Sequence, residues 1–274
     1  GTNDLGAQTT AITVTDVNEA PVVANAIADA STNEDAAYSL SLSNVFTDVD
    51  SGDSCTYSMS GAPSTLSLSS GTISGTPTNA NVGTHTITVS CSDGSLSVSD
   101  EYVLTVANTN DAPTVASAIA DASTAEDASY SLNAAAAFTD VDSGDTLTYT
   151  MSGAPSTLSI SSGTISGTPL NADVGAHTII VTATDGASAA VSDTFVLTVT
   201  NTNDAPTVAN AIADASTNED AAYSLSLSNV FTDVDSGDSC TYSMSGAPST
   251  LSLSSGTISG TPTNANVGDH TIVV

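Results

Sequence analysis

The chain has 274 residues, 30 Asp and Glu, no Lys or Arg and 3 His, which gives a formal net charge of -30 at pH 7. This charge excludes nucleic-acid binding, which depends on Lys and Arg at phosphates, and no apolar run approaches the roughly 18 residues that membrane insertion requires. With 39% hydrophobic and only 11% charged residues, the chain is too apolar for a disordered acidic tail, and we expect it to fold.

Residues 1–19 are predicted to contain the last strand of a preceding repeat and a junction. Ala11–Pro21 (AITVTDVNEAP) aligns with Val103–Pro113 (VLTVANTNDAP), and the third copy stops before its final strands because Val274 aligns with Val89. Two interpretations stay open. The chain is a window of a longer array, or it is a subunit whose first strand completes the third repeat of a neighbouring copy.

Three copies of one unit follow. The phrase FTDVDSGD begins at Phe46, Phe138 and Phe231, 92 and then 93 residues apart. Residues 23–83 are identical to residues 208–268, whereas the middle copy differs, as in an array that grew by recent duplication. Repetition of this kind is a better guide to domain number than length. We predict repeats over residues 20–111, 112–204 and 205–274.

Within each repeat the hydrophobic pattern is that of strands buried on one face. Cys55, Tyr57 and Met59 alternate with polar residues, and residues 86–91 show the same period of two. Clusters of Gly, Pro, Asn and Asp separate such runs at intervals of about ten residues, as in a sandwich of roughly seven strands. Residues 134–137 are compatible with one helical turn. The pattern predicts an all-β fold with one sandwich per repeat.

Two cysteines of the first repeat are predicted to form a disulfide. The second repeat has Leu147 and Ala183 at the positions of Cys55 and Cys91, so the two cysteines are present or absent together. Cys240 occupies the position of Cys55 in the third copy. Closing a loop of about 35 residues stabilises by a few kcal/mol in an oxidising compartment, outside the cytosol. A pair of buried thiols is the alternative.

The acidic residues gather in four short phrases per repeat. These are the junction around NDAP, the NED or AED pair, the DVDSGD loop and an Asp at the end of a strand. Like charges packed in this way repel each other, and the chain has no Lys or Arg to neutralise them. Ca²⁺ takes six to eight oxygen ligands from carboxylates, amides and backbone carbonyls. The pattern predicts calcium sites; the alternative is that Asp and Asn cap tight turns without a metal.

The order of Glu34-Asp35, FTDVDSGDSCTYSMSG, SGTISGTP, VSCSDG and NTNDAP resembles a cadherin repeat. The resemblance is greatest to the bacterial cadherin-like, dystroglycan-type or "putative immunoglobulin" modules of large surface adhesins. It covers the whole chain and implies tandem Ig/cadherin-like β-sandwiches of about 92 residues in an elongated rod. In cadherins, the acidic phrases of adjoining repeats meet and bind several Ca²⁺ ions.

Carried over residue by residue, the resemblance implies three calcium junctions and one further ligand, Glu219, for a following repeat. The first junction combines Asp16, Asn18 and Glu19 with Asp48, Asp50, Asp53 and Asp93. The second combines Glu34, Asn108, Asn110 and Asp111 with Asp140, Asp142, Asp145 and Asp185. The third combines Glu126, Asn201, Asn203 and Asp204 with Asp233, Asp235 and Asp238. Whether the neighbouring Asp35, Asp127 and Asp220 also ligate is left open.

The chain departs from the cadherin pattern in two places. TNANVG (78–83) and LNADVG (170–175) stand where cadherins carry an acidic Leu-Asp-Arg-Glu motif. Asn108 and Asn201 replace the leading Asp that is found at Asp16. These departures imply fewer or weaker sites, within the range of extracellular modules that bind Ca²⁺ with Kd values of about 10⁻⁴ to 10⁻³ M.

No residue pattern indicates catalysis. His85, His177 and His270 each follow a VG pair at the start of a strand, a position typical of a structural histidine. No serine has a nucleophile-elbow context, and the paired carboxylates recur in every copy. Carbohydrate binding is a more remote alternative, because it favours exposed aromatic residues and the chain has no Trp.

We therefore expect a non-enzymatic structural protein that is extracellular or on the cell surface and is stiffened by Ca²⁺. In one version it forms a surface fibre or filament in which copies join head to tail by strand addition. In the other it is a stalk or spacer of a giant calcium-dependent adhesin. Its partners are then copies of itself or adjoining repeats, and any cell-surface target is bound by regions outside this chain.

Overall fold

The computed structural model describes residues 1, 6–50 and 52–274. Residues 2–5 of the predicted first segment and Ser51 of the first FTDVDSGD loop lie outside the described residues. The chain divides into two compact units: unit 1 is residues 1–112 with 140–146, and unit 2 is residues 113–139 with 147–274. The described residues contain no helix that is long and apolar enough to cross a membrane.

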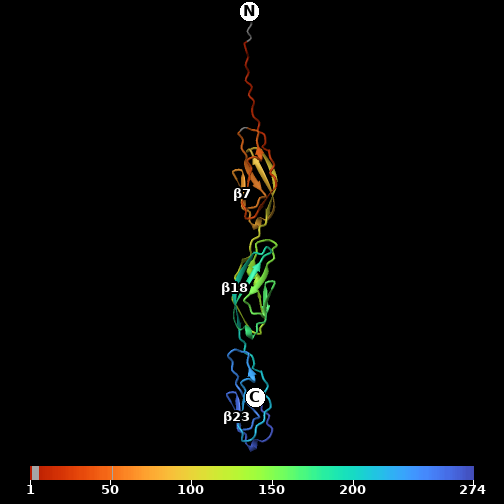
Figure 1. Cartoon of the computed structure of the whole chain (residues 1–274). Helices are drawn as coiled ribbons and strands as arrows, with labels where there is room; N and C mark the ends of the chain where they lie inside the picture. The colour runs from red at the N-terminus through yellow and green to blue at the C-terminus, as the bar shows by residue number, and fades with distance from the viewer. Residues whose placement is uncertain (2–5, 51) are drawn as a thin grey trace. The chain divides into compact units, whose positions relative to one another are not determined.

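Unit 1 contains a β-sandwich, which Figure 1 shows around the label β7. One sheet has the order β2 (Ala30–Asn33), β9 (Ser97–Ala107), β8 (Gly83–Ser92) and β5 (Thr56–Ser60). The other has the order β3 (Tyr38–Ser41), β7 (Thr72–Gly75) and β6 (Leu66–Ser69). The short strands β1 (Val22–Val23) and β4 (Phe46–Thr47) form a separate pair, and the 3₁₀ turn η1 (Asn79–Asn81) precedes β8.

The core of unit 1 follows from the period-two pattern. Alternate residues of β8 and β9 are buried, and Ile87 and Leu104 are fully enclosed together with Ile73 of β7. β2 pairs with β9 in parallel, with Ala30 opposite Leu104, whereas β5, β8 and β9 pair antiparallel. The prediction of an all-β sandwich is therefore confirmed. The parallel pair brings the end of β2 beside the end of the repeat.

Unit 2 contains the third sequence repeat and the second repeat without residues 112 and 140–146. In the second, β11 (Ala122–Ala125), β18 (Ala190–Thr200), β17 (Gly175–Thr184) and β14 (Thr148–Ser152) form one sheet. β12 (Tyr130–Asn133), β16 (Thr164–Gly167) and β15 (Leu158–Ser161) form the other, and β10 (Thr114–Val115) pairs with β13 (Phe138–Thr139). The 3₁₀ turn η3 is Asn171–Asp173, and the turn expected at residues 134–137 is the 3₁₀ turn η2 (Ala134–Ala137).

The third repeat forms only part of this fold. β20 (Tyr223–Ser226), β23 (Thr257–Gly260) and β22 (Leu251–Ser254) make one sheet, β19 (Thr207–Val208) pairs with β21 (Phe231–Thr232), and η4 is Asn264–Asn266. Residues 215–218, which correspond to β2 and β11, form no strand. The strand that β9 and β18 supply in the other repeats would follow Val274, so residues 215–218 have no ladder to join.

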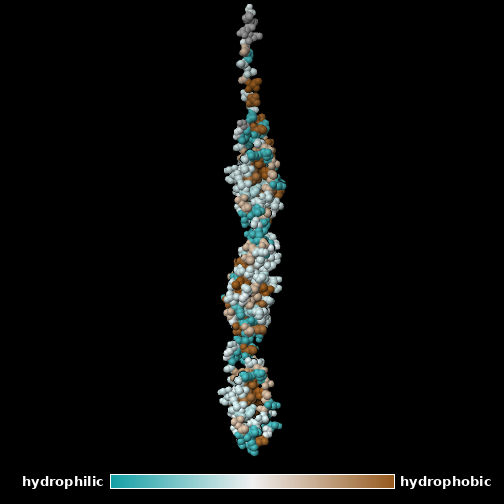
Figure 2. All heavy atoms as spheres, viewed as in Figure 1, coloured by the Kyte–Doolittle hydropathy of each residue, from teal (hydrophilic) through white to brown (hydrophobic). Residues whose placement is uncertain are grey.

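The segment before the first sandwich also lacks a strand partner. Residues 6–21 lie outside any strand, although Ile12, Val14 and Val17 are all hydrophobic and exposed. Figure 2 shows hydrophobic residues along this segment. A strand forms only against a partner, so the strand expected over residues 11–15 stays a prediction.

The expected disulfide is present in unit 1. Cys55 and Cys91 are bonded, with their Cα atoms 5.1 Å apart and a sequence separation of 36. Cys91 is fully buried opposite Tyr57 of β5. The prediction from their joint presence is therefore confirmed over the alternative of two thiols, and Cys240 of the third repeat is free.

Candidate metal centres

The DVDSGD loops are Asx turns that leave carboxylate oxygens unused. The N–H of Asp142 donates to Asp140 Oδ1 at 2.9 Å, and the N–H of Asp145 donates to the carbonyl of Asp142 at 3.3 Å. The corresponding bond from Asp50 to Asp48 Oδ1 is also 2.9 Å. Among the described residues, Oδ2 of Asp48 and of Asp140 is buried without a hydrogen-bond partner. The Asx turns account for one oxygen of each leading Asp and not for the other.

Glu34 and Glu126 carry the clearest unsatisfied oxygens. Each side chain is 2% exposed at the end of the strand that pairs in parallel with the last strand of its repeat. Glu34 Oε1 accepts the N–H of Thr109 at 2.9 Å, and Glu126 Oε1 accepts the N–H of Thr202 at 2.8 Å. Oε2 of both residues is buried without a partner among the described residues. A buried carboxylate oxygen in this state is costly unless a cation or a proton satisfies it.

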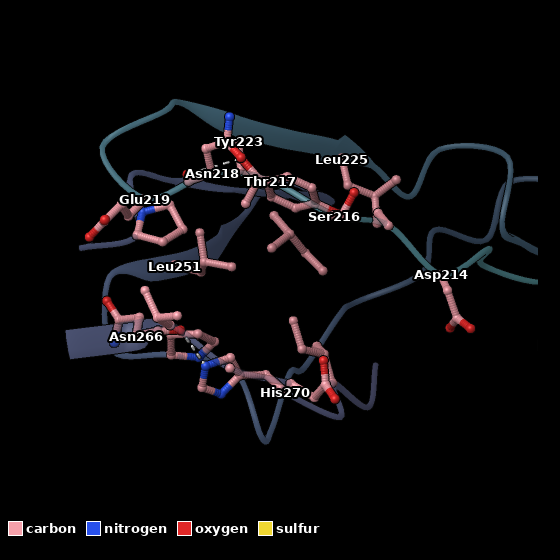
Figure 3. A pocket seen from close by; sticks show the side chains of 18 of the residues that line it. Asp214, Ser216, Thr217, Asn218, Glu219, Tyr223, Leu225, Leu251, Asn266 and His270 are labelled. Carbon is pink, nitrogen blue, oxygen red and sulfur yellow. Dashed lines mark hydrogen bonds between the residues drawn. The ribbon is translucent and has the colours of Figure 1, made fainter. Parts of the chain in front are cut away.

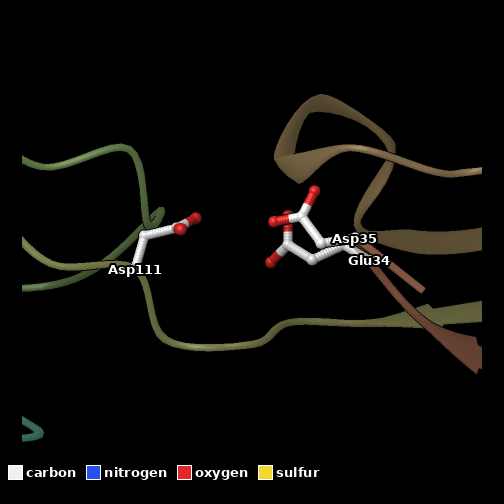
Figure 4. A group of neighbouring side chains, drawn as sticks. All are labelled: Glu34, Asp35 and Asp111. Atoms are coloured by element: carbon white, nitrogen blue, oxygen red, sulfur yellow. The ribbon is translucent and has the colours of Figure 1, made fainter.

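The backbone directs a second carboxylate toward the Glu34 site. Asp35 follows Glu34 with a positive φ of 55° and donates its N–H to the carbonyl of Pro77 at 2.8 Å. Asp tolerates this left-handed conformation better than most residues. Figure 4 shows the carboxylates of Glu34 and Asp35 directed toward that of Asp111. Asp35, whose part was left open, is therefore brought into the group.

Within the described part of the chain, five groups of carboxylates place ligand atoms within 4.8 Å of one another. Unit 1 has three groups: Glu34, Asp35 and Asp111; Asp48, Asp53 and Asp93; and Asp140, Asp142 and Asp145. Unit 2 has two groups that share Asp235: Glu126, Asp204 and Asp235; and Asp233, Asp235 and Asp238. Each group lies within one unit, and most of the predicted acidic residues belong to one of them.

Hydrogen bonds connect these groups through the central Asp of each loop. In unit 1, Asp142 Oδ2 accepts the N–H of Asp111 at 2.7 Å. In unit 2, Asp235 Oδ2 accepts the N–H of Asp204 at 2.6 Å. The first loop follows the same rule, because Asp50 Oδ2 accepts the N–H of Glu19 at 2.7 Å. The three loops therefore have one local geometry.

Two asparagines of the site were not among the predicted ligands. Asn79 of η1 donates from Nδ2 to Asp142 Oδ1 at 2.8 Å, and Asn171 of η3 donates to Asp235 Oδ1 at 3.1 Å. Both belong to the TNANVG and LNADVG segments, which stand out in the sequence only because the acidic Leu-Asp-Arg-Glu motif of cadherins is missing there. Their recurrence at the same position was the available signal.

The remaining predicted ligands are not members of these groups of carboxylates. Asn110 and Asn203 donate to the carbonyls of the next residues, Asp111 and Asp204, at 2.8 and 2.9 Å. Asp185 Oδ1 accepts the N–H of Ala189 at 2.8 Å, and Asn18 donates to Asp93 Oδ2 at 3.1 Å. Asp16, Asn108, Asn201 and Glu219 are exposed.

The electrostatics of these groups disfavours several negative charges. Burial, and then repulsion from Asp142, raises the pKa of Asp111, and burial followed by Asp235 does the same for the pKa of Asp204. The pKa of Asp53 is raised by burial and then by Asp48. Asp93 differs, because backbone N–H groups of residues 96 and 95 lower its pKa. A divalent cation would relieve the repulsion that raises the first three values.

The oxygen-only chemistry of these groups fits a hard cation. The carboxylate oxygens of Glu34, Asp35 and Asp111 are of the type that Ca²⁺ binds. The groups contain no His or Cys, the ligands that Zn²⁺ and softer metals prefer. The residues therefore fit Ca²⁺.

The histidines are held as structural residues. Nε2 of His85, His177 and His270 lies 2.7, 2.6 and 2.8 Å from the carbonyl oxygens of Asn81, Asp173 and Asn266. Each histidine therefore secures the 3₁₀ turn that precedes it. This geometry supports the structural interpretation.

The third repeat has a groove of about 900 Å³ that the other repeats fill with a strand. Its apolar lining includes Tyr223, Leu225, Leu251, Ile258 and Ile272, and Asp214 and Glu219 also line it. Figure 3 shows Leu225 and Leu251 in this groove, with Asn266 hydrogen-bonded to His270 on one side. The counterparts of these apolar residues in unit 1 belong to its core.

A family model described as "Putative Ig domain" matches residues 20–107, 112–200 and 205–274. Among curated proteins, the "Serine-rich adhesin for platelets" of Staphylococcus aureus strain MRSA252 is 41% identical over 133 residues. The homologous adhesin of strain MSSA476 has the same identity over the same length. Each match covers 47% of this chain but only 9% and 6% of the two adhesins, so the chain spans less than a tenth of these relatives.

Among solved structures, mouse cadherin-23 EC22-24 matches 90% of this chain and 89% of its own length, with 19% identity and a TM-score of 0.52. This likeness shows the fold of tandem cadherin-like domains. An endo-fucoidan hydrolase of glycoside hydrolase family 107 is 27% identical over 67% of this chain and 29% of its own, with a TM-score of 0.34. That score is too low to support an argument about function.

Proposed function

The chain belongs to the Putative Ig domain family, and from this premise we propose that it is a calcium-stiffened spacer of an extracellular adhesin. Adhesin relatives and Ig-like repeats place it outside the cell or on the cell surface. We propose no catalytic role, because the histidines secure turns and the carboxylates recur in each repeat. Binding to a surface target belongs, in this proposal, to regions outside the chain.

The observation that carries the proposal is the buried, unpartnered Oε2 of Glu34 and Glu126. Each lies in a carboxylate group with the junction Asp of its own unit, Asp111 or Asp204. When Ca²⁺ is bound, its charge offsets the repulsion among these carboxylates and its coordination satisfies the orphaned oxygens. The carboxylates would provide oxygen ligands that already lie close together. A bound ion would link segments whose negative charges otherwise repel each other.

The direct test is calcium titration by calorimetry, with melting followed in parallel. We expect Kd values of about 10⁻⁴ to 10⁻³ M and a higher melting temperature in Ca²⁺. Mg²⁺ at equal ionic strength separates coordination from screening, because screening alone does not distinguish the two ions. Absence of calcium heat together with identical melting in Ca²⁺ and in chelator would contradict the proposal.

A filament assembled by strand addition is the second candidate, and the hydrophobic pattern of residues 11–15 favours it. In the first repeat, Leu104 and Val106 of β9 fill the corresponding place and are almost fully buried. Ile12 and Val14, which align with these two residues, are exposed. A strand with the pattern of residues 11–15 therefore suits the groove.

An acidic residue that lines the groove, Asp214, supports the same match. Asp29 Oδ1 accepts the N–H of Val103 in β9 at 2.8 Å, and Asp121 Oδ1 accepts the N–H of Val196 in β18 at 2.7 Å. Asp214 occupies the corresponding position in the third repeat and lines the groove. In a filament, a second copy would offer the N–H of Ala11 to Asp214. In a stalk, the continuing chain would supply that N–H.

A peptide of residues 6–19 tests the filament version. Binding that raises the melting temperature of the third repeat, and that is lost in a peptide with Ile12→Asp and Val14→Asp, is the expected result. No effect of the unmodified peptide contradicts strand addition. The denatured, reduced mass of the natural polypeptide then identifies the source of the strand, because a mass near 27 kDa indicates a discrete subunit and a much larger one a covalent array.

A further inference from the structure

Asn79 and Asn171 contact the acidic loops with neutral amides. Asn79 Nδ2 lies 2.8 Å from Asp142 Oδ1, and Asn171 Nδ2 lies 3.1 Å from Asp235 Oδ1. A carboxylate only accepts hydrogen bonds, so the donating amide nitrogen must face it. The same contact occurs once in each unit. It is therefore a property of the repeat and not of one loop.

The turn that carries Asn79 is itself held in place. Asn81 is largely buried, and its Oδ1 accepts the N–H of Thr78 at 3.0 Å and the hydroxyl of Thr65 at 2.9 Å. The carbonyl oxygen of Asn81 is hydrogen-bonded to Nε2 of His85 at 2.7 Å. These bonds fix η1 against β8, so Asn79 is presented to Asp142 from a rigid support.

Asp142 is consequently held without an ion. Its Oδ1 accepts from Asn79 and its Oδ2 from the N–H of Asp111, and the side chain is 7% exposed. Each oxygen retains a further lone pair, which stays available for a cation. Hydrogen bonds to a charged acceptor are stronger than neutral ones, so these two bonds define where the carboxylate lies.

We propose that Asn79 and Asn171 are latch residues that set the calcium affinity of these sites. In the absence of ion, their amides hold Asp142 and Asp235 in the ligating position. Because they stand where a carboxylate would add negative charge, they also keep the affinity for Ca²⁺ low, since affinity rises with the number of charged ligands. The holding of Asp142 and Asp235 is inferred from the hydrogen bonds alone. The effect on affinity rests in addition on the proposed calcium function.

Amide exchange in chelator, followed by NMR, tests the latch without any metal. In Asn79→Ala, Asp142 is released, and the amide of Asp111 should exchange roughly tenfold faster than in the wild-type chain. Asn264→Ala is the matched control, because Asn264 has the same place in η4 and is exposed. Unchanged exchange at Asp111 overturns the latch, provided that the core amides of β8 show that the variant is folded.

Calcium titration of Asn79→Asp tests the effect on affinity. We expect the affinity for Ca²⁺ to rise about tenfold and the melting temperature in chelator to fall, because the introduced carboxylate would repel Asp142 when no ion is present. Asn264→Asp should change neither value. If the wild-type chain binds Ca²⁺ and Asn79→Asp binds it no more tightly, the effect on affinity is refuted. If the wild-type chain binds no Ca²⁺, the proposed function fails and the exchange data still decide the latch.

Discussion

Glu34 Oε1 holds the N–H of Thr109, 75 residues further along the chain, at 2.9 Å. The other oxygen of the same carboxylate is buried without a partner among the described residues. The Glu34 side chain therefore binds the backbone that follows β9 with one oxygen. Its other oxygen stays available as a ligand atom at the same end of the repeat. Glu126 and Thr202 repeat this relationship in unit 2.

Glu34→Gln should weaken calcium binding in unit 1 and stabilise the ion-free chain. The amide keeps an oxygen for the N–H of Thr109 but removes the negative charge that attracts the ion, so the affinity of this site should fall by about tenfold or more. In chelator, the same loss of charge should raise the melting temperature. Calorimetry and melting curves measure both effects. Glu101→Gln, on the exposed face of β9, is the control; an equal effect of both substitutions would show that general charge, and not this site, is responsible.

Removal of Ca²⁺ should lower the melting temperature of the wild-type chain by about 10 °C. At 10 mM Ca²⁺ and a Kd of about 10⁻⁴ to 10⁻³ M, one site that binds only the folded chain contributes about 1.4 to 2.7 kcal/mol. For a domain of this size, 1 kcal/mol corresponds to about 4–8 °C. Scanning calorimetry in Ca²⁺, Mg²⁺ and chelator makes the comparison. A shift that NaCl reproduces at equal ionic strength would assign the effect to screening.

Ion-free stability should fall as the pH rises from about 4 to 7. Burial and Asp142 raise the pKa of Asp111, and burial and Asp235 raise that of Asp204. A carboxyl whose pKa is higher in the folded chain contributes stability that is full below its ordinary pKa of about 4 and is lost as the pH rises through the raised value. Asp93, with its lowered pKa, opposes this trend below pH 4.

Asp111→Asn isolates this pH effect. In chelator at pH 7, the variant should melt above the wild-type chain, and the difference should shrink as the pH falls toward 4, because the raised pKa of Asp111 favours its protonation. Melting curves across this range measure the difference. Asp269→Asn, at an exposed residue outside the acidic groups, should leave the pH dependence unchanged. A variant that is no more stable than the wild-type chain at pH 7 would contradict the assignment to Asp111.

Reduction should destabilise the first repeat and leave the second unaffected. The bond between Cys55 and Cys91 closes a long loop, and its loss is expected to cost about 2–4 kcal/mol. The second repeat, with Leu147 and Ala183 at these positions, is an internal control. Residue-level denaturation followed by NMR, with and without reductant, separates the two repeats. Parallel loss of stability in both would show that the repeats unfold as one cooperative body.

The fold and most of the acidic site follow from local patterns. The period of two in β8 and the joint presence of Cys55 and Cys91 report contacts that each repeat must make, and repetition shows them more than once. The acidic groups were anticipated because their phrases recur at fixed places and resemble those of cadherins. In each case, residue type and spacing carry the physical information.

What the sequence did not reveal depends on contacts between distant segments. Asn79 looks like an ordinary turn residue, and only the path of η1 brings its amide to Asp142. Asp35 enters its group because its backbone turns left-handed. The absence of a strand at residues 215–218 reflects a missing partner and not an unfavourable composition, because the same residues, ASTN, form β2.

The parallel pairing of β2 with β9 also constrains how the protein can be made. Ala30 of β2 cannot pair until Leu104, 74 residues later, has been synthesised. A repeat emerging from the ribosome therefore keeps an open sheet edge until its last strand is complete. During that interval, a strand from a similar repeat can take the vacant place, the usual route to misassembly in tandem arrays. The first and third repeats share 61 identical consecutive residues, and the second repeat, which lies between them, keeps most of the same residues. Each nascent repeat therefore has a similar neighbour, so completion of its own last strand before that neighbour emerges favours correct pairing during biosynthesis.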